Sequence, residues 1–250
     1  MESPETLPIL YHDEHLIAVA KPTGMFVHCT DEDRSEKSAV LQIVRNQIGA
    51  FVYTIHRLDR ATSGALLLAL TRDTASKMNQ MFSERRVCKT YHALVRGYCP
   101  QQGKITTPLI PARGRSKPRD HPHAKPQSAK TEFRRQLIYE LPIPNTQHQT
   151  TRCSLVEITP HTGRYHQIRR HFNYESHPII GDTSHGDSRH NRIYQDNSGL
   201  NRLMLAAVCI EFEHPLTQKL TTITCPPDRS FSAIVDELAP FECSVHGTCD

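Results

Sequence analysis

A lone carboxylate between two arginines is the first feature of this sequence that could carry chemistry. In the stretch HRLDRATSG, Asp59 lies between Arg57 and Arg60, after the apolar run FVYTI and before the apolar run ALLLAL. Charged side chains are seldom buried unless they are paired, so the pattern predicts a short loop between two strands. A nearby arginine favours the ionised form of a carboxylic acid. Asp59 is therefore a candidate nucleophile or base.

The same aspartate has a structural alternative. An aspartate in a turn more often caps a backbone N–H group or forms half of a salt bridge than takes part in catalysis. Thr62, Ser63 and Gly64 follow it and permit the sharp turn that would present its side chain. The loop alone leaves both interpretations open.

Motifs for other kinds of chemistry are missing from the sequence. The chain has no GxSxG for a serine nucleophile and no GxGxxG or GxxxxGK for a nucleotide phosphate. Its 16 histidines include no HExxH motif, and its eight cysteines form no CxxC pair. Cys243, His246 and Cys249 are evenly spaced near the end of the chain, where a frayed terminus is the simpler explanation. We therefore expect no metal and no nucleotide cofactor, and chemistry by side chains alone.

Positive charge is concentrated in the middle of the chain. Residues 85–135 contain 13 Lys or Arg against two acids, a net charge of +11, whereas the whole chain carries +4. Such a region favours a polyanionic partner such as nucleic acid. The segment PARGRSKPRDHPHAKPQ within it has no periodic apolar face, which predicts a flexible basic insertion at about 100–130. A solvated charged loop without a partner is the alternative.

Hydrophobic periodicity predicts more strands than helices. Strands are expected at 16–20, 51–55, 65–70, 89–97, 131–139, 154–158, 202–215 and 219–226. Helices are expected at 38–48, 73–86, 159–175 and 231–238, with Asp73 as the cap of the second. Several strands are joined too briefly for parallel crossovers. We therefore expect an α+β fold with a largely antiparallel mixed sheet flanked by helices, formed by residues 1–250 as a single domain with a polar tail at 243–250.

The expected helix at 159–175 is rich in basic residues. Tyr165, Ile168 and Phe172 recur at helical spacing and form an apolar stripe. The spacing predicts that the basic side chains lie largely off the buried face: Arg164, His166, Arg169 and Arg170.

Nothing in the sequence predicts export or a membrane. The start, MESPETLPIL, has neither the basic nor the apolar region of a signal peptide. The longest aliphatic block, ALLLAL, is too short to span a bilayer. The cysteines form no compact framework, which is typical of a reducing compartment. We expect a cytoplasmic protein, and a monomer.

Six motifs in order resemble those of the RluA family of pseudouridine synthases. HRLDRATSG is similar to that family's catalytic HRLDxxTSG. The others are KPTGMFVH (21–28), KTYHALVRG (89–97), TGRYHQIRRH (162–171), HPIIGD (177–182) and RLMLAA (202–207). Together they span about residues 10–226. The resemblance implies a pseudouridine synthase-like fold with a central active-site cleft, and an isomerase that converts uridine to pseudouridine in RNA without a cofactor.

The resemblance also implies roles for single residues. Asp59 would be the essential carboxylate, which either attacks the ribose at C1′ or abstracts a ribose proton. Arg169 would pair with Asp59 and keep it ionised. Tyr91 would stack on the uracil, although without the family an ordinary inward-facing strand residue is the simpler interpretation.

Further residues would bind a uridine that has been flipped out of its helix. Arg57 would enter the gap left by the base, and Leu203 or Leu205 would form an apolar wall. Lys21 and His28 would shape the edge of the site. The remaining candidates would contact RNA, several of them by neutralising phosphates: Arg60, Arg113, Arg115, Lys117, Arg119, Lys125 and Arg164.

Four details point to tRNA, at uridine 65, as the substrate, because they resemble the members of the family that act there. They are the absence of an N-terminal S4-like RNA-binding module, the segment ILYHDEHLIAVAKP (9–22), the HRLDRxTSG variant and the segment GDTSHGDSRHNR (181–192). A ribosomal RNA loop is the alternative substrate. Ala206 stands where the family usually has histidine in RLxLHA, and this departure alone favours a different alternative, a non-catalytic RNA-binding or chaperone-like protein that retains the fold.

Overall fold

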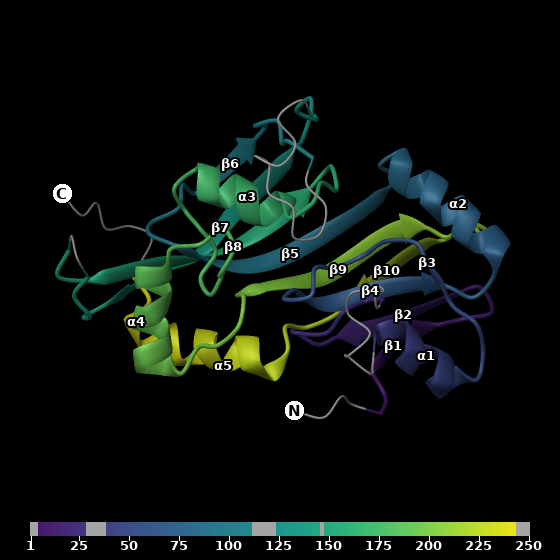
Figure 1. The fold of residues 1–250 in the computed structure, drawn as a ribbon, viewed down its shortest axis with the longest axis horizontal. Helices are drawn as coiled ribbons and strands as arrows, with labels where there is room; N and C mark the ends of the chain where they lie inside the picture. The colour runs from purple at the N-terminus through teal and green to yellow at the C-terminus, as the bar shows by residue number, and fades with distance from the viewer. Residues whose placement is uncertain (1–4, 29–38, 112–123, 146–147, 244–250) are drawn as a thin grey trace. The chain divides into compact units, whose positions relative to one another are not determined.

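The computed structural model describes residues 5–28, 39–111, 124–145 and 148–243. Its internal contacts divide the chain into two units (Figure 1). The first unit comprises Met1–Thr90 and Leu205–Arg229, and the second comprises Tyr91–Met204 and Ser230–Asp250. Each unit therefore takes in two separate stretches of the sequence.

The first unit is built around two buried strands, β2 and β4, whose sequences are almost continuously apolar. Strand β2 (Leu16–Lys21) pairs antiparallel with β1 (Ile9–His12) and with β4 (Ser63–Ala69). The short β3 (Tyr53–Thr54) also pairs antiparallel with β4. Strand β9 (Leu205–Glu213) pairs parallel with β4 and antiparallel with β10 (Leu220–Thr224).

The parallel pairing of β4 with β9 depends on a glycine of the HRLDRATSG motif. Gly64 lies opposite Ala207 and has φ +114, in the region that favours glycine. A Cβ atom at this position would lie 2.1 Å from the carbonyl oxygen of Ala207. The two backbones can therefore approach only because residue 64 has no side chain.

Two helices belong to the first unit, α1 (Val40–Ile48) and α2 (Arg72–Ser83). Helix α2 packs Ala75, Met78 and Met81 into the same core cluster as the strand residues Leu67 and Phe212. Its cap differs from the prediction.

Thr71, and not Asp73, is the N-cap, since the Thr71 hydroxyl accepts the Thr74 N–H at 3.2 Å. Asp73 lies inside the first turn, where its carboxylate is 2.8 Å from the Lys77 ammonium. The N-cap therefore lies two residues before the predicted one.

The second unit contains four antiparallel strands in the order β5-β8-β7-β6. Their bounds are Val87–Arg96 for β5, Gln102–Ile105 for β6, Thr131–Leu141 for β7 and Thr151–Pro160 for β8. Strand β5 begins in the first unit and continues into the second. No pattern predicts β6, because its sequence QGKI is short and mostly polar.

Helices α3 (Gln167–Tyr174) and α4 (Ser188–Ser198) belong to the second unit, and α5 (Arg229–Leu238) begins at its boundary. A short 3-10 turn, η3 (Ala239–Phe241), follows α5. Helix α3 covers β7, with the rings of Phe172 and Phe133 5.2 Å apart (Figure 1). The sequence analysis missed α4, because SRHNRIYQDNS has too few apolar residues to form a stripe.

The predicted α+β class and largely antiparallel mixed sheet are confirmed, since β4–β9 is parallel whereas β1–β2, β2–β4, β3–β4, β9–β10, β5–β8, β7–β8 and β6–β7 are antiparallel. The strand predicted at 51–55 is reduced to the two residues of β3. No helix within the described ranges is long and apolar enough to cross a membrane.

A single catalytic domain with a flexible basic insertion stays a prediction. Four of the basic residues expected to bind RNA lie outside the described residues: Arg113, Arg115, Lys117 and Arg119. The same holds for His246 and Cys249 in the polar tail.

Candidate active site

The loop between β3 and β4, residues 55–62, presents Asp59 in the first unit. A turn closes within it, because the Asp59 carbonyl accepts the Thr62 N–H at 3.0 Å. Leu58 and Ile55 point into the protein and are buried, whereas Arg57 and Arg60 are exposed. Asp59 itself is half-buried. The alternation of apolar and charged residues in the sequence thus anchors the loop and leaves its charges near the surface.

The segment KPTGMF (21–26) holds this loop by hydrogen bonds to its backbone. Lys21 is 1% exposed, and its Nζ donates to the carbonyls of Arg60 at 3.0 Å and Pro22 at 2.8 Å. The Thr23 hydroxyl donates to the Ala61 carbonyl at 2.7 Å. The Gly24 N–H donates to the Arg60 carbonyl at 2.9 Å. These hydrogen bonds therefore fix the Asp59 loop directly after the aspartate, through its backbone carbonyl groups.

Arg60 takes part in the same arrangement. Its Nε donates to the Gly24 carbonyl at 2.9 Å, and its guanidinium lies 4.8 Å from the centre of the Phe26 ring. A cation above an aromatic face is attracted by the ring quadrupole. Arg60 was predicted to contact RNA, and the structure gives it a positioning role in the loop.

A neutral histidine holds the other side of the loop. His56 Nε2 accepts the Leu67 N–H of β4 at 2.9 Å, and the imidazole stacks on Phe82 with ring centres 5.1 Å apart. Burial, assisted by the Lys89 charge, lowers the pKa of His56 to about 3. An uncharged ring can accept this N–H at neutral pH, and the sequence analysis did not assign His56 this role.

In the second unit, Tyr91 lies on β5 opposite Ile158 of β8 and is 9% exposed. Its burial agrees with an inward-facing strand residue, and it is compatible with a ring whose edge or face remains accessible. Stacking of Tyr91 on a base stays a prediction.

Arg169 corrects the predicted orientation of α3. It was expected off the buried face, yet it is 5% exposed. Its Nε and Nη2 each donate to a carboxylate oxygen of Asp182 at 2.7 Å. A bidentate carboxylate compensates a buried guanidinium, which apolar periodicity cannot anticipate. The predicted pair between Arg169 and Asp59 stays a prediction.

Asp182 organises the surroundings of Arg169. Its Oδ1 also accepts the N–H groups of Ser184 and His185 at 2.9 Å. Burial alone would raise the pKa of Asp182, but hydrogen bonds and the charge of Arg169 outweigh it and lower that pKa. The ionised Asp182, from the HPIIGD motif, therefore fixes the direction in which Arg169 points.

The start of α3 is held by polar side chains of the TGRYHQIRRH motif. The Thr162 hydroxyl donates to Gln167 Oε1 at 2.7 Å, and Gln167 Nε2 donates to the Thr131 hydroxyl at 2.9 Å. His166 lies at φ +51, and its Nδ1 is 2.9 Å from His185 Nε2. Burial, followed by the Arg169 charge, lowers the pKa of His166 to about 3.

The remaining predicted site residues lie in both units. Leu203 belongs to the second unit and Leu205 to the first, and each is 3% exposed. Arg164 is half-buried, and its Nε donates to the Ser128 carbonyl at 3.2 Å. His28 and Lys125 are exposed.

Ala206, at the family's usual histidine position, is fully buried opposite Ser63 of β4. It therefore contributes packing next to the strand that follows the Asp59 loop. Within the part of the chain that the structure describes, no three His, Cys, Asp or Glu side chains form a group that could hold a metal ion.

Comparison with known proteins identifies relatives over nearly the whole chain. Residues 15–174 match the sequence model of the family described as RNA pseudouridylate synthase. The chain is 44% identical over 232 residues to tRNA pseudouridine synthase C of Pasteurella multocida, covering 92% of this chain and 96% of that protein. It is 42% identical to the Vibrio cholerae protein of the same name, of which it covers 95%. It spans 62% of the length of the Pectobacterium carotovorum relative, at 44% identity.

Two solved structures of pseudouridylate synthase domains are similar to this chain. The chain is similar to Human RNA Pseudouridylate Synthase Domain Containing 1, with a TM-score of 0.70 and 25% identity, over 96% of each chain. It shares its fold with Human RNA Pseudouridylate Synthase Domain Containing 4, with a TM-score of 0.69 and 22% identity over 93% of each chain. Since the family match covers the Asp59 loop, Tyr91 and Arg169 in one continuous stretch, this chain belongs to the RNA pseudouridylate synthase family.

Proposed function

We propose that this protein is a tRNA pseudouridine synthase, an isomerase that converts a uridine of tRNA, uridine 65, to pseudouridine with Asp59 as its catalytic carboxylate. The observation that carries the proposal is the Asp59 loop, held through its backbone by Lys21, Thr23 and Gly24 in a family member. The substrate is supported by relatives named tRNA pseudouridine synthase C at 38–44% identity.

The reaction requires only bond exchange. The C1′–N1 glycosidic bond breaks, the uracil rotates, and a C1′–C5 bond forms while the proton on C5 is transferred to solvent and N1 regains one. Nothing is oxidised and no group is imported, so side chains suffice. Asp59 either attacks C1′ and is later displaced, or removes a ribose proton that is later returned.

Arg169 and Tyr91 would assist Asp59. A guanidinium held in one direction by Asp182 is suited to keep a second carboxylate ionised and aimed. An aromatic ring that stacks on uracil can stay in contact while the base turns. In this proposal the three residues act on the same uridine.

A uridine in a stem must first be flipped out, at a cost of a few kcal/mol in stacking and pairing. The exposed Arg57 would fill the gap that the base leaves. Leu203 and Leu205 would exclude water from the intermediate, and Arg60 and Arg164 would contact the RNA. The basic residues of the insertion would neutralise phosphates: Arg113, Arg115, Lys117, Arg119 and Lys125. We propose that the protein acts in the cytoplasm as a monomer, without a nucleotide cofactor.

Substitution of the carboxylate tests the proposal. Asp59→Asn keeps the shape of the side chain but removes its charge, so we expect pseudouridine formation in a tRNA transcript to fall by at least ~10³-fold, as for a covalent or acid–base catalyst. Asp73→Asn, at an exposed aspartate of the same unit, is the matched control and should retain full activity. Asp59→Asn activity near wild type would remove Asp59 from its proposed role.

Chemical mapping of pseudouridine in RNA from cells that lack the protein tests the substrate. Loss of the modification at uridine 65 of tRNA is expected. Loss in ribosomal RNA instead would favour the alternative substrate. Unchanged modification everywhere would favour a non-catalytic RNA-binding protein, for which Ala206 is the supporting feature.

A further inference from the structure

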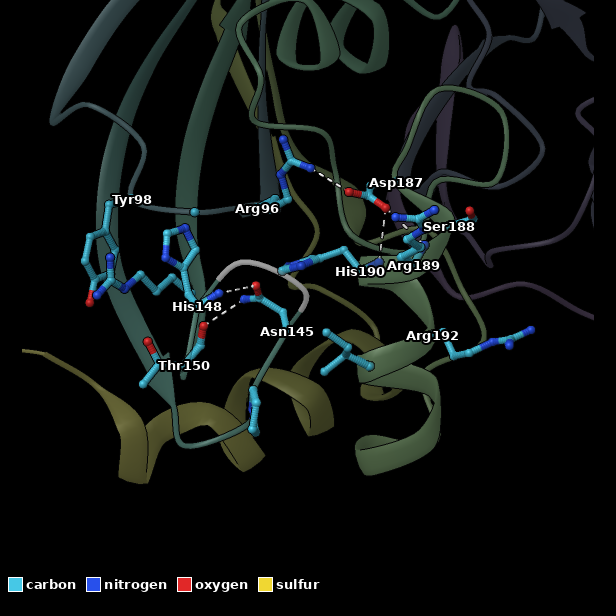
Figure 2. A pocket seen from close by; sticks show the side chains of 14 residues that line it. Arg96, Tyr98, Asn145, His148, Thr150, Asp187, Ser188, Arg189, His190 and Arg192 are labelled. Atoms are coloured by element: carbon cyan, nitrogen blue, oxygen red, sulfur yellow. Dashed lines mark hydrogen bonds and ion pairs between the residues drawn. The ribbon is translucent and has the colours of Figure 1, made fainter.

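A cleft in the second unit is lined in part by residues to which the proposed reaction gives no role. It has a volume of about 1130 Å³ and is lined by the ends of β5 and β8, by Asn145 and His148, and by the first turns of α4 (Figure 2). The α4 residues come from GDTSHGDSRHNR, the segment that sequence comparison singled out but to which no role was given. None of Asp59, Tyr91 and Arg169 lines this cleft.

The lining is strongly basic. It includes Arg96, Arg152, Arg189 and Arg192 against a single acid, Asp187, which gives three net positive charges before any histidine is counted. Asp187 is already engaged, since its Oδ2 lies 2.6 Å from Arg96 Nη1 and its Oδ1 accepts the N–H groups of Arg189 and His190. Asp187 therefore caps α4 and compensates Arg96, and it forms no side-chain pair with Arg189 or Arg192.

Two of the four arginines have no side-chain partner among the described residues. Neither Arg189 nor Arg192 forms an ion pair or a side-chain hydrogen bond there, and both are exposed. By contrast, Arg152 pairs with Glu140 at 3.0 Å and lies 4.8 Å from the Tyr98 ring centre. Arg189 and Arg192 can thus bind an anion without breaking an existing contact.

His190 has a ring nitrogen without a hydrogen-bond partner among the described residues. Its ring projects from α4 toward the side of the cleft that carries Tyr98 and His148 (Figure 2). His190 Nε2 is buried and has no hydrogen-bond partner within the described ranges. Burial, then the Arg96 charge, lowers the pKa of His190 to about 4, so the ring is neutral. In the tautomer protonated at Nε2 it would donate to a ligand oxygen, and buried polar groups normally find such a partner.

The size of the cleft indicates the class of ligand. Pockets for small molecules measure about 300–1,000 Å³, so this space exceeds the needs of one phosphate. Arginines, a neutral imidazole and an aromatic ring together suit a phosphodiester chain with an exposed base. We infer that this cleft binds the sugar-phosphate backbone of the RNA substrate at nucleotides other than the modified uridine. This inference rests on the RNA substrate of the proposed function.

Paired substitution of these two arginines tests the inference. The variant is Arg189→Ala/Arg192→Ala, and the matched control is Arg72→Ala, an exposed arginine of the first unit that also has no ion pair among the described residues. Binding of a labelled tRNA transcript to each full-length protein is measured by fluorescence anisotropy over a range of salt concentrations. Pseudouridine formation is measured in parallel.

Loss of two phosphate contacts should reduce the slope of log K against log salt by about 1.5 and weaken binding roughly tenfold at moderate salt. KM for the tRNA should rise accordingly, with kcat within about twofold of wild type. A slope and a KM equal to those of Arg72→Ala would overturn the inference.

Two further comparisons distinguish failure of this inference from failure of the proposed reaction and from binding of a free nucleotide. If the wild-type protein makes no pseudouridine yet the paired variant still loses slope, the proposed reaction fails and the RNA contact stands. Uridine monophosphate is added in a thermal unfolding assay to detect a free nucleotide as ligand. Stabilisation of the wild type but not of the paired variant, with an unchanged RNA slope, would replace RNA with a mononucleotide and overturn the inference.

Discussion

The Asp59 loop and the surroundings of Arg169 hold charged side chains in two different ways. In the first unit, Lys21, Thr23 and Gly24 bind the carbonyl groups that follow Asp59. In the second unit, Arg169 is fixed by a buried, bidentate carboxylate from Asp182. Backbone hydrogen bonds position a loop through several of its carbonyl groups, whereas a bidentate ion pair orients a single guanidinium.

This difference has an energetic consequence. A buried ion pair that loses one partner leaves an uncompensated charge in the interior, which costs about 3–5 kcal/mol. A hydrogen-bonded loop that loses one donor leaves a carbonyl unsatisfied, at about 1–3 kcal/mol. The second unit should therefore be more sensitive to a single substitution than the loop.

The largest expected effect is that of Asp182→Asn. The substitution removes the charge opposite Arg169, and we expect the free energy of unfolding to fall by about 3–5 kcal/mol. Chemical denaturation followed by circular dichroism measures it. Asp73→Asn breaks an exposed pair and should cost at most about 1 kcal/mol. Equal losses of unfolding free energy in the two variants would mean that the buried pair Asp182–Arg169 contributes no more to stability than the exposed pair Asp73–Lys77.

A smaller effect is expected for Lys21→Met, which keeps the length of the buried side chain but removes two hydrogen bonds. We expect a loss of about 1–3 kcal/mol in unfolding free energy and a lower kcat, because the Asp59 loop loses its support. KM for RNA should change little. Lys77→Met, at an exposed lysine of α2, serves as the control. A normal kcat in a destabilised Lys21→Met protein would separate the loop contacts from catalysis.

A third expected effect is on the pH dependence of stability. The pKa of His56 is about 3 in the folded protein, against 6.5 for an unperturbed histidine. Between these two values the unfolded chain binds a proton at His56 that the folded state does not bind. His56 thus favours the folded state above pH 6.5, and this contribution is lost as the pH falls toward 3. In His56→Gln, unfolding free energy measured between pH 7 and pH 4 should fall less steeply than in wild type. Parallel curves would show that His56 does not titrate on unfolding.

The sequence alone predicted the strands and helices that have a clear pattern of apolar residues. The apolar runs at 16–20 and 65–70 correspond to β2 and β4, because a continuous apolar run of that length favours a buried strand over a helix. The six motifs identified the family, which the comparisons confirm. The same patterns missed α4, whose residues are polar and whose start is set by the Asp187 cap.

The proposed role of Asp59, between Arg57 and Arg60, follows from the order of residues in one short loop. The tertiary structure decided what holds that loop, because Lys21 and Arg60 are 39 positions apart in sequence and meet only when β2 pairs with β4. It also decided that Arg169 is buried and that Arg189 and Arg192 line a cleft. Pairing and burial of charges depend on distant partners, and a linear pattern of hydrophobicity contains no information about which partner a charge will find.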